Sequence, residues 1–186
     1  MKKIILAMVA VMVPLMLSAG STDFWFRHFS VEDGLSSSAV RAIMQDKYGF
    51  MWLGTDDGLN RYDGTTIKIY RLNPEGVNDY ISFLYDTTDR IWIGTGDGVY
   101  IYDYETENFE PFKLLTAKGD SIKTNVNHIA EDRDGNLWFS TVGQGIFKYN
   151  VSKHYLERYE FKDADGLMAS VLIDSCLLDT SPSPRD

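Results

Sequence analysis

The stretch QDKYGFMWLGTDDGLNRYD, Gln45 to Asp63, decides the fold, because two further copies of it follow along the chain. The second copy reads YDTTDRIWIGTGDGVYIYD, Tyr85 to Asp103, and the third reads EDRDGNLWFSTVGQGIFKYN, Glu131 to Asn150. Their tryptophans, Trp52, Trp92 and Trp138, stand 40 and 46 residues apart. Self-similarity at a period of this size indicates a repeat architecture.

Five residue types recur in each copy: an Asp six residues before the Trp, the Trp itself, a Thr three residues after it, then a Gly and a Tyr. These positions are Asp46, Trp52, Thr55, Gly58 and Tyr62; Asp86, Trp92, Thr95, Gly98 and Tyr102; and Asp132, Trp138, Thr141, Gly145 and Tyr149. We expect the tryptophans Trp52, Trp92 and Trp138 and the glycines Gly58, Gly98 and Gly145 to be structural positions of the repeat. The third copy has one extra residue between Thr141 and Gly145, which suits a loop because loops tolerate insertions.

Each copy contains four short runs of alternating apolar residues. In the first copy the runs are 40–45, 50–54, 59–62 and 66–70, separated by Gly, Asp and Asn. Such runs, bounded by turn residues, predict antiparallel strands joined by hairpins. Four strands in a unit of this length are typical of a β-propeller blade. We therefore expect an all-β fold with blades at about 30–70, 76–112 and 122–160, a partial fourth blade from 165, and no closed ring within the chain.

The N-terminal residues 1–20 have the build of a secretory signal peptide. Lys2 and Lys3 precede an apolar run, Ile4 to Leu17, and small residues follow it. The run is short for a membrane span, which needs about 20 residues, although an uncleaved anchor is the alternative interpretation. Export to the periplasm is expected. The single cysteine, Cys176, cannot form an internal disulfide, so sheet packing must stabilise the exported chain.

The two ends of the repeat region lead to further expectations. Phe24 to Phe29 (FWFRHF) resembles the fourth strand of a blade, which would complete the last blade of a closed ring. Residues 175–186 contain no Trp and no Gly turn. We expect them to be a non-repeat tail that is not native, with a natural disordered tail as the alternative.

The stretch FSVEDGLSSSAVRAI (Phe29 to Ile43), followed by Gln45 to Gly64, resembles the two-component regulator propeller repeat, and the resemblance covers residues 24–174. It implies the periplasmic, ligand-sensing part of a hybrid two-component sensor of the Bacteroidetes type, membrane-anchored at full length. Such sensors bind oligosaccharides and control genes for polysaccharide utilisation. The implied partners are an oligosaccharide, the remaining propeller blades and a dimer partner. The histidine kinase and DNA-binding modules of the relatives are not expected in this chain, which would then not be an enzyme.

Other chemistry finds little support in the sequence. The net charge of −9 argues against a nucleic-acid partner, because phosphates repel an acidic surface. His28, His128 and His154 are scattered and predict no metal site, and no cofactor motif is present. The stretch Asp132 to Asn136 resembles the start of a calcium loop, but Gly143 stands where the loop needs Glu, so a hairpin turn is expected.

A ligand should contact loops at one end of the blades, where residues differ between copies. Loops that follow the second strand and loops that lead into the first strand share that end. They supply the candidate ligand-binding residues Asp56, Asp57, Tyr80, Asp97, Asn125 and Gln144. Two other functions remain open at this stage: an exported propeller enzyme of the lyase or glycosidase type, and an interaction scaffold without a small ligand.

Overall fold

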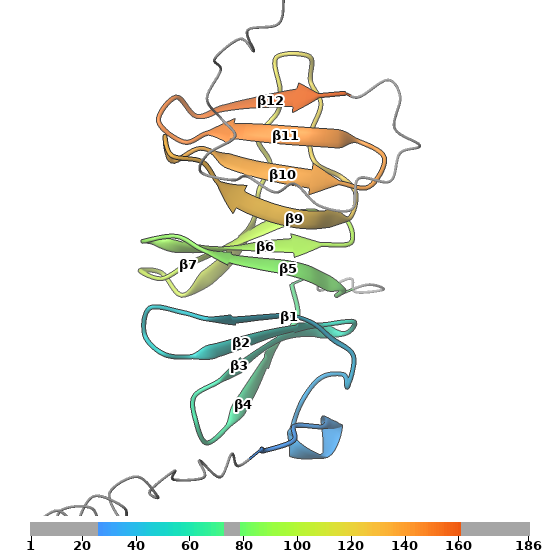
Figure 1. Cartoon of the computed structure of the whole chain (residues 1–186), viewed down its shortest axis with the longest axis vertical. Helices are drawn as coiled ribbons and strands as arrows, with labels where there is room; N and C mark the ends of the chain where they lie inside the picture. The colour runs from blue at the N-terminus through green and yellow to red at the C-terminus, as the bar shows by residue number, and fades with distance from the viewer. Residues whose placement is uncertain (1–25, 73–78, 161–186) are drawn as a thin grey trace, which may run out of the picture.

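The computed structural model describes residues 26–72 and 79–160, which form three four-stranded antiparallel sheets. The strands of each sheet pair in chain order, each with the next, as hairpins require. The three sheets stand one above another in Figure 1, one for each copy of the repeat, and within the described residues no sheet closes on itself. The predicted all-β fold of four-stranded propeller blades that do not close in this chain is confirmed.

The strands lie where the copies of the repeat predict them. Blade 1 contains β1 (Val40–Gln45), β2 (Met51–Thr55), β3 (Gly58–Tyr62) and β4 (Ile67–Tyr70). Blade 2 contains β5 (Ile81–Asp86), β6 (Arg90–Thr95), β7 (Gly98–Asp103) and β8 (Asn108–Pro111). Blade 3 contains β9 (Val126–Glu131), β10 (Leu137–Thr141), β11 (Gly145–Asn150) and β12 (Tyr155–Tyr159). A short 3-10 helix, Val31–Asp33, precedes blade 1.

Successive blades approach each other most closely at their first strands. Strand β5 lies against β1 and β2, and β9 lies against β5 and β6. A Cβ atom on Gly54 would stand 2.5 Å from Cγ2 of Ile81, and one on Gly94 would stand 3.1 Å from the carbonyl oxygen of Val126. Only glycine permits such an approach without displacing the neighbouring strand. Blade 3 has Ser140 at the same position.

The hydrophobic core lies between the blades. Trp52 is fully buried between blades 1 and 2, where its ring centre stands 5.1 Å from that of Tyr102. Trp92 occupies the corresponding place between blades 2 and 3, 5.8 Å from Tyr149. The Tyr near the end of the third strand thus packs on the Trp of the preceding blade, and tilted contacts of this kind stabilise aromatic cores. Trp138 is half-buried and stacks on Tyr159 of its own blade.

The repeated Thr and Gly hold the turn between the second and third strands. The hydroxyl of the Thr donates to the carbonyl of the Gly, at 2.9 Å from Thr55 to Gly58 and 3.0 Å from Thr95 to Gly98. Gly98 has φ 143°, and a Cβ added there would lie 2.9 Å from the carbonyl oxygen of Ile122. Backbone geometry and the neighbouring segment both demand glycine at this turn.

Several expectations fall outside the described residues: the signal peptide 1–20, the partial fourth blade from 165 and the tail 175–186. Of the strand expected at 24–29, residues 26–29 are described and form no strand. Phe26 is 94% exposed, whereas Phe29 packs edge-on against Tyr62, with ring centres 4.9 Å apart. A fourth strand pairs with the third strand of its own blade, and the described residues offer none for it. None of the helices in the described part of the chain has the length and hydropathy for a membrane crossing.

Candidate functional site

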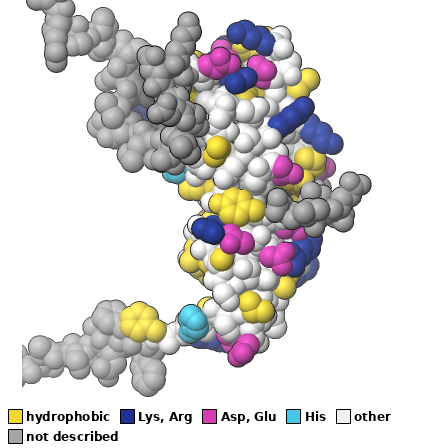
Figure 2. All heavy atoms as spheres, turned by 90° about the vertical axis from the view of Figure 1, so that its right-hand side faces the viewer, with side chains coloured by type: hydrophobic (Ala, Val, Ile, Leu, Met, Phe, Trp, Pro, Cys, Tyr) yellow, Lys and Arg dark blue, Asp and Glu magenta, His cyan; other side chains and the backbone are white. Residues whose placement is uncertain are grey.

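The six candidate residues lie at one end of the strands, the right-hand end in Figure 1. They occupy the turns after β2, β6 and β10 or the positions just before β5 and β9. The residues are Asp56, Asp57, Asp97, Gln144, Tyr80 and Asn125. Figure 2 faces this end and shows acidic and basic side chains interspersed across it. We call it the loop end of the array.

Asp56 forms a two-pronged ion pair with Arg41 of β1. Nε and Nη2 of Arg41 donate to the two carboxylate oxygens at 2.7 and 3.0 Å. These hydrogen bonds hold the pKa of Asp56 below its usual value, so the carboxylate stays charged. The Arg41 guanidinium also stands 5.9 Å from the ring centre of Tyr80. Two of the predicted residues, from blades 1 and 2, therefore meet around an arginine that the repeat pattern did not indicate.

Asp57 pairs in the same manner with Arg71, whose Nη2 donates to Oδ2 at 2.9 Å. That hydrogen bond lowers the pKa of Asp57. The same guanidinium lies 3.9 Å from buried Asp79, just before β5. Both carboxylates of the β2–β3 turn are thus ionised and paired, which suits them to orient hydrogen-bonding groups rather than to transfer protons.

Of the other three candidates, Gln144 and Asp97 form side-chain hydrogen bonds with neighbouring residues, and the side-chain oxygen of Asn125 does not. The side chain of Gln144 accepts from the backbone of Lys123 at 2.9 Å and donates to that of Ser121 at 3.3 Å, which fixes the segment that enters blade 3. Asp97 accepts from the Thr95 hydroxyl at 2.7 Å. The side-chain oxygen of Asn125 is buried and has no partner among the described residues. The structure therefore gathers the six residues at one end without joining them in a single cavity.

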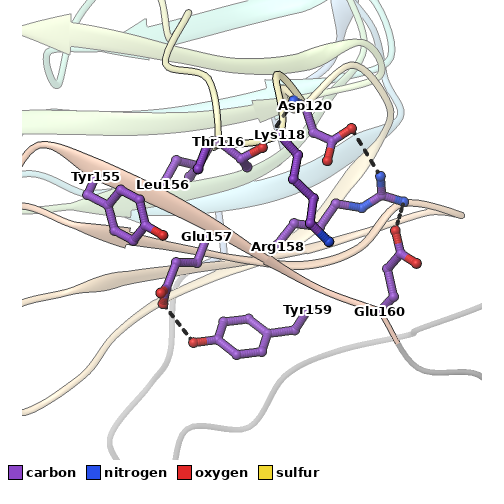
Figure 3. Close-up of a pocket in the computed structure, with 10 residues that line it drawn as sticks. Thr116, Lys118, Asp120, Tyr155, Leu156, Glu157, Arg158, Tyr159 and Glu160 are labelled. Carbon is purple, nitrogen blue, oxygen red and sulfur yellow. Dashed lines mark hydrogen bonds and ion pairs between the residues drawn. The ribbon is translucent and has the colours of Figure 1, made fainter.

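Two shallow cavities lie near these residues. One, of about 340 Å³, opens beside Asp97 and is bounded by Phe112, Leu115 and Lys123. The other, of about 320 Å³, runs along β12 and is drawn in Figure 3. There Arg158 points between Asp120 and Glu160, at 3.5 and 3.2 Å, while its Nε donates to the carbonyl of Gln144 at 2.7 Å. The sequence pattern did not indicate Arg158, because its partners come from a different loop.

The histidines and the stretch that resembles a calcium loop have structural surroundings among the described residues. In residues 26–72 and 79–160, no three His, Cys, Asp or Glu side chains gather as metal ligands. His128 lies 4.5 Å from the ring of Phe83, and burial lowers its pKa. Asp132 accepts from the backbone nitrogens of Asp134 and Asn136, at 3.1 and 2.8 Å. The stretch that resembles a calcium loop is therefore the β9–β10 hairpin turn.

Comparisons with known proteins agree with the resemblance seen in the sequence. Residues 34–57 and 121–143 match the family model of the two component regulator propeller. Histidine kinase P4 of Formosa agariphila is 56% identical over 59 residues, which make up 32% of this chain and 4% of that protein.

Solved structures of other proteins resemble this fold. The extracellular domain of a hybrid two component system from Bacteroides thetaiotaomicron superposes with a TM-score of 0.64 and 30% identity, over 72% of this chain and 20% of that chain. Virginiamycin B lyase from Staphylococcus aureus superposes with a TM-score of 0.52 and 15% identity, over 68% of this chain and 42% of the lyase. The second likeness shows the fold alone. The predicted resemblance to two-component regulator propeller repeats is confirmed, and the chain spans only a small part of each relative.

Proposed function

We propose that this chain, with its two-component regulator propeller repeats, is a ligand-sensing segment of the extracellular propeller of a two-component sensor. The observation that carries the proposal is the match of residues 34–57 and 121–143 to that repeat. In the structure these residues form the entry segment and the first two strands of blades 1 and 3, with the turn between those strands. The likeness to the extracellular domain of a hybrid two component system supports the same assignment.

The ligand we propose is an oligosaccharide, whose binding signals to genes for polysaccharide utilisation. Sugar hydroxyls both donate and accept hydrogen bonds, and the loop end carries charged and hydroxyl groups of both kinds. Arg41, Asp56 and Tyr80 form one such group, held in place by the ion pair between Arg41 and Asp56. Small-molecule sites are commonly built from a few polar groups fixed in this way on a rigid scaffold.

The remaining parts of the proposal concern the setting of the chain. It is exported and lies on the periplasmic side of the inner membrane. Further propeller blades and a dimer partner complete the receptor. The chain itself carries out no reaction, and the kinase activity belongs to other modules of the full-length protein.

A glycan array probed with the intact receptor ectodomain tests this proposal, together with a transcriptional reporter in the host. We expect binding to a defined class of oligosaccharide and reporter induction by the same sugars. Arg41→Ala should weaken binding, because it leaves Asp56 without its partner. Lys68→Ala, on the outer strand β4, serves as the control that leaves binding unchanged. Absence of any bound glycan and of any induction would overturn the proposal, and turnover of a bound glycan into products would favour an exported enzyme instead.

A further inference from the structure

We propose that a cavity between blades 2 and 3, at the end of the strands opposite to the loop end, binds one sugar ring, with the indole N–H of Trp92 as a donor to it. The cavity has a volume of about 360 Å³, near the lower limit for small-molecule sites. Its lining comes from the β5–β6 turn and from blade 3, and includes Asp89, Arg90, Trp92, Glu131, Val151 and His154. The choice of a sugar rests on the proposed function, whereas the location rests on the observations that follow.

The cavity exists because two features that fill the corresponding space between blades 1 and 2 are missing here: a large aromatic side chain and one residue of the turn. Between blades 1 and 2 the same space is occupied by Tyr104, the residue that follows β7. Its ring centre stands 5.2 Å from that of Tyr48 and 4.4 Å from the ammonium of Lys47. Between blades 2 and 3 the smaller Val151, which follows β11, takes the place of Tyr104. The β5–β6 connection is also one residue shorter than the β1–β2 connection, as the strand registers show.

Within residues 26–72 and 79–160, the shorter turn also leaves the Trp92 indole nitrogen without a hydrogen-bond partner. In blades 1 and 3 the Trp donates to the Asp six residues before it, at 2.7 Å from Trp52 to Asp46 and 2.9 Å from Trp138 to Asp132. In blade 2 the corresponding Asp86 accepts from the Tyr104 hydroxyl instead, at 2.9 Å.

Among the described residues the Trp92 nitrogen therefore has no hydrogen-bond partner. Trp92 is only 3% exposed, yet this nitrogen is not one of the fully buried polar atoms that lack a partner, so it reaches solvent. Since Trp92 lines the cavity, its ring fills the core and its polar edge is available to a ligand.

The other groups around the cavity indicate the class of ligand. Arg90 also lines the cavity and adds a positive charge; its Nε lies 3.3 Å from Asp89 and is fully buried, without a hydrogen-bond partner among the described residues. Asp89 and Glu131 supply acceptors, and their negative charges disfavour an anionic ligand. Leu137 and Val151 form an apolar wall. The Trp92 donor and the carboxylate acceptors beside an apolar wall suit a polyhydroxylated ring, whose hydroxyls both donate and accept hydrogen bonds and whose C–H faces are apolar.

The test follows the indole N–H signals of Trp25, Trp52, Trp92 and Trp138 by NMR during titration of the chain. The probes are glucose, galactose, mannose, xylose and their β-linked disaccharides, each to about 20 mM, which exceeds millimolar dissociation constants. We expect the Trp92 signal, identified by its loss in Trp92→Phe, to shift. The Trp52 and Trp138 signals should stay, because their donors are already bonded to Asp46 and Asp132.

A matched pair of variants locates the site. Val151→Tyr copies the residue that fills the space between blades 1 and 2, so it should abolish the Trp92 shift and leave the melting temperature unchanged. Val151→Ala keeps the cavity open and should retain the shift. A silent Trp92 signal with every probe, or a shift unaffected by Val151→Tyr, would overturn this inference. If the intact ectodomain still binds glycans in that case, the proposed function stands without this site; if it binds none, both fail.

Discussion

The indole nitrogen of Trp52 donates a 2.7 Å hydrogen bond to Oδ2 of Asp46, and both side chains are buried. The other carboxylate oxygen accepts from the backbone nitrogens of Tyr48 and Phe50, each at 2.9 Å. One carboxylate therefore fixes the β1–β2 turn and the orientation of the core tryptophan together. Asp132 repeats this arrangement with Trp138, and hydrogen bonds from Trp138 and Asn136 outweigh the effect of burial, so that its pKa is lowered.

Asp46→Ala should destabilise the chain by about 1–3 kcal/mol, because it leaves the buried indole N–H of Trp52 without an acceptor. Asp86→Ala is the matched control, since Asp86 has the same place in the sequence but accepts from the Tyr104 hydroxyl rather than from the tryptophan of its blade. We expect a smaller loss for it. Urea unfolding at one low protein concentration measures both. Equal losses would show that the buried Asp–Trp hydrogen bond contributes nothing beyond the turn.

Gly98→Ala should cost about 1–3 kcal/mol, because the side chain would require an unfavourable backbone at φ 143°. The added Cβ would also press on the carbonyl of Ile122. Gly64→Ala separates the two effects, since Gly64 also has a positive φ, of 98°, but has open space around it. Thermal unfolding of both variants checks this. If Gly98→Ala is no worse than Gly64→Ala, the close approach of the blade 3 entry segment is not a source of destabilisation.

Stability should fall as the solution is acidified below the ordinary histidine pKa of 6.5, because burial lowers the pKa of His128 in the folded chain. Above that pH the imidazole is neutral in both the folded and the unfolded chain. His128 therefore contributes no pH dependence to the stability in that range. Between 6.5 and the lowered pKa of the folded chain, the unfolded chain takes up the proton and the folded chain does not, so stability falls with the pH until both are protonated. His128→Phe, which copies Phe83 of blade 2, should weaken this dependence. Melting temperatures at about pH 7.5 and about pH 5 compare the two proteins. The same loss in both would rule out His128 as its source.

The chain on its own should associate as its concentration rises. Ile43 of blade 1 is 64% exposed, whereas its counterparts Leu84 and Ile129 are 7% and 1% exposed because a preceding blade covers them. At the other end of the described array, Trp138 is half-buried and stacks on Tyr159, which is 40% exposed. Repeat units bury these faces only against neighbours, and open sheets template association.

Light scattering measures this association over a concentration series. Ile43→Lys should reduce it, and Val31→Lys, at an exposed residue of the 3-10 helix, should not. A sharp two-state melt together with a monomeric mass at high concentration would show that three blades form a self-sufficient domain.

The fold was readable from the sequence because each blade repeats its turn and core residues at nearly fixed offsets. The function of each repeated residue was less readable. Asp46, Asp86 and Asp132 share one spacing from the Trp, yet Asp86 bonds a tyrosine, because one residue fewer in the β5–β6 connection shifts it into the strand.

The candidate site was harder to predict for a related reason. The loop positions follow from the repeat, but the partners of Asp56 and Asp57 are arginines 15 and 14 residues away, in positions that no periodicity marks. The cavity beside Trp92 depends on the size of Val151, some 59 positions further along, measured against Tyr104 in another blade. Such complementarity between distant side chains appears only when the blades are placed side by side.

Blade 3 has Ser140 at the position where blades 1 and 2 have Gly54 and Gly94, and this difference affects how blades pack. A ring with perfect rotational symmetry turns by the same angle from every blade to the next, and that angle depends on how close the inner strands come. Gly54 and Gly94 allow the tightest approach, with Ile81 and Val126 standing where a side chain would be. Ser140 carries a Cβ atom and a hydroxyl at that point, so a blade docked on blade 3 has to stand further out or turn by a different step. The rotation that relates blades 1 to 2 and 2 to 3 therefore should not be repeated by a blade that docks on blade 3.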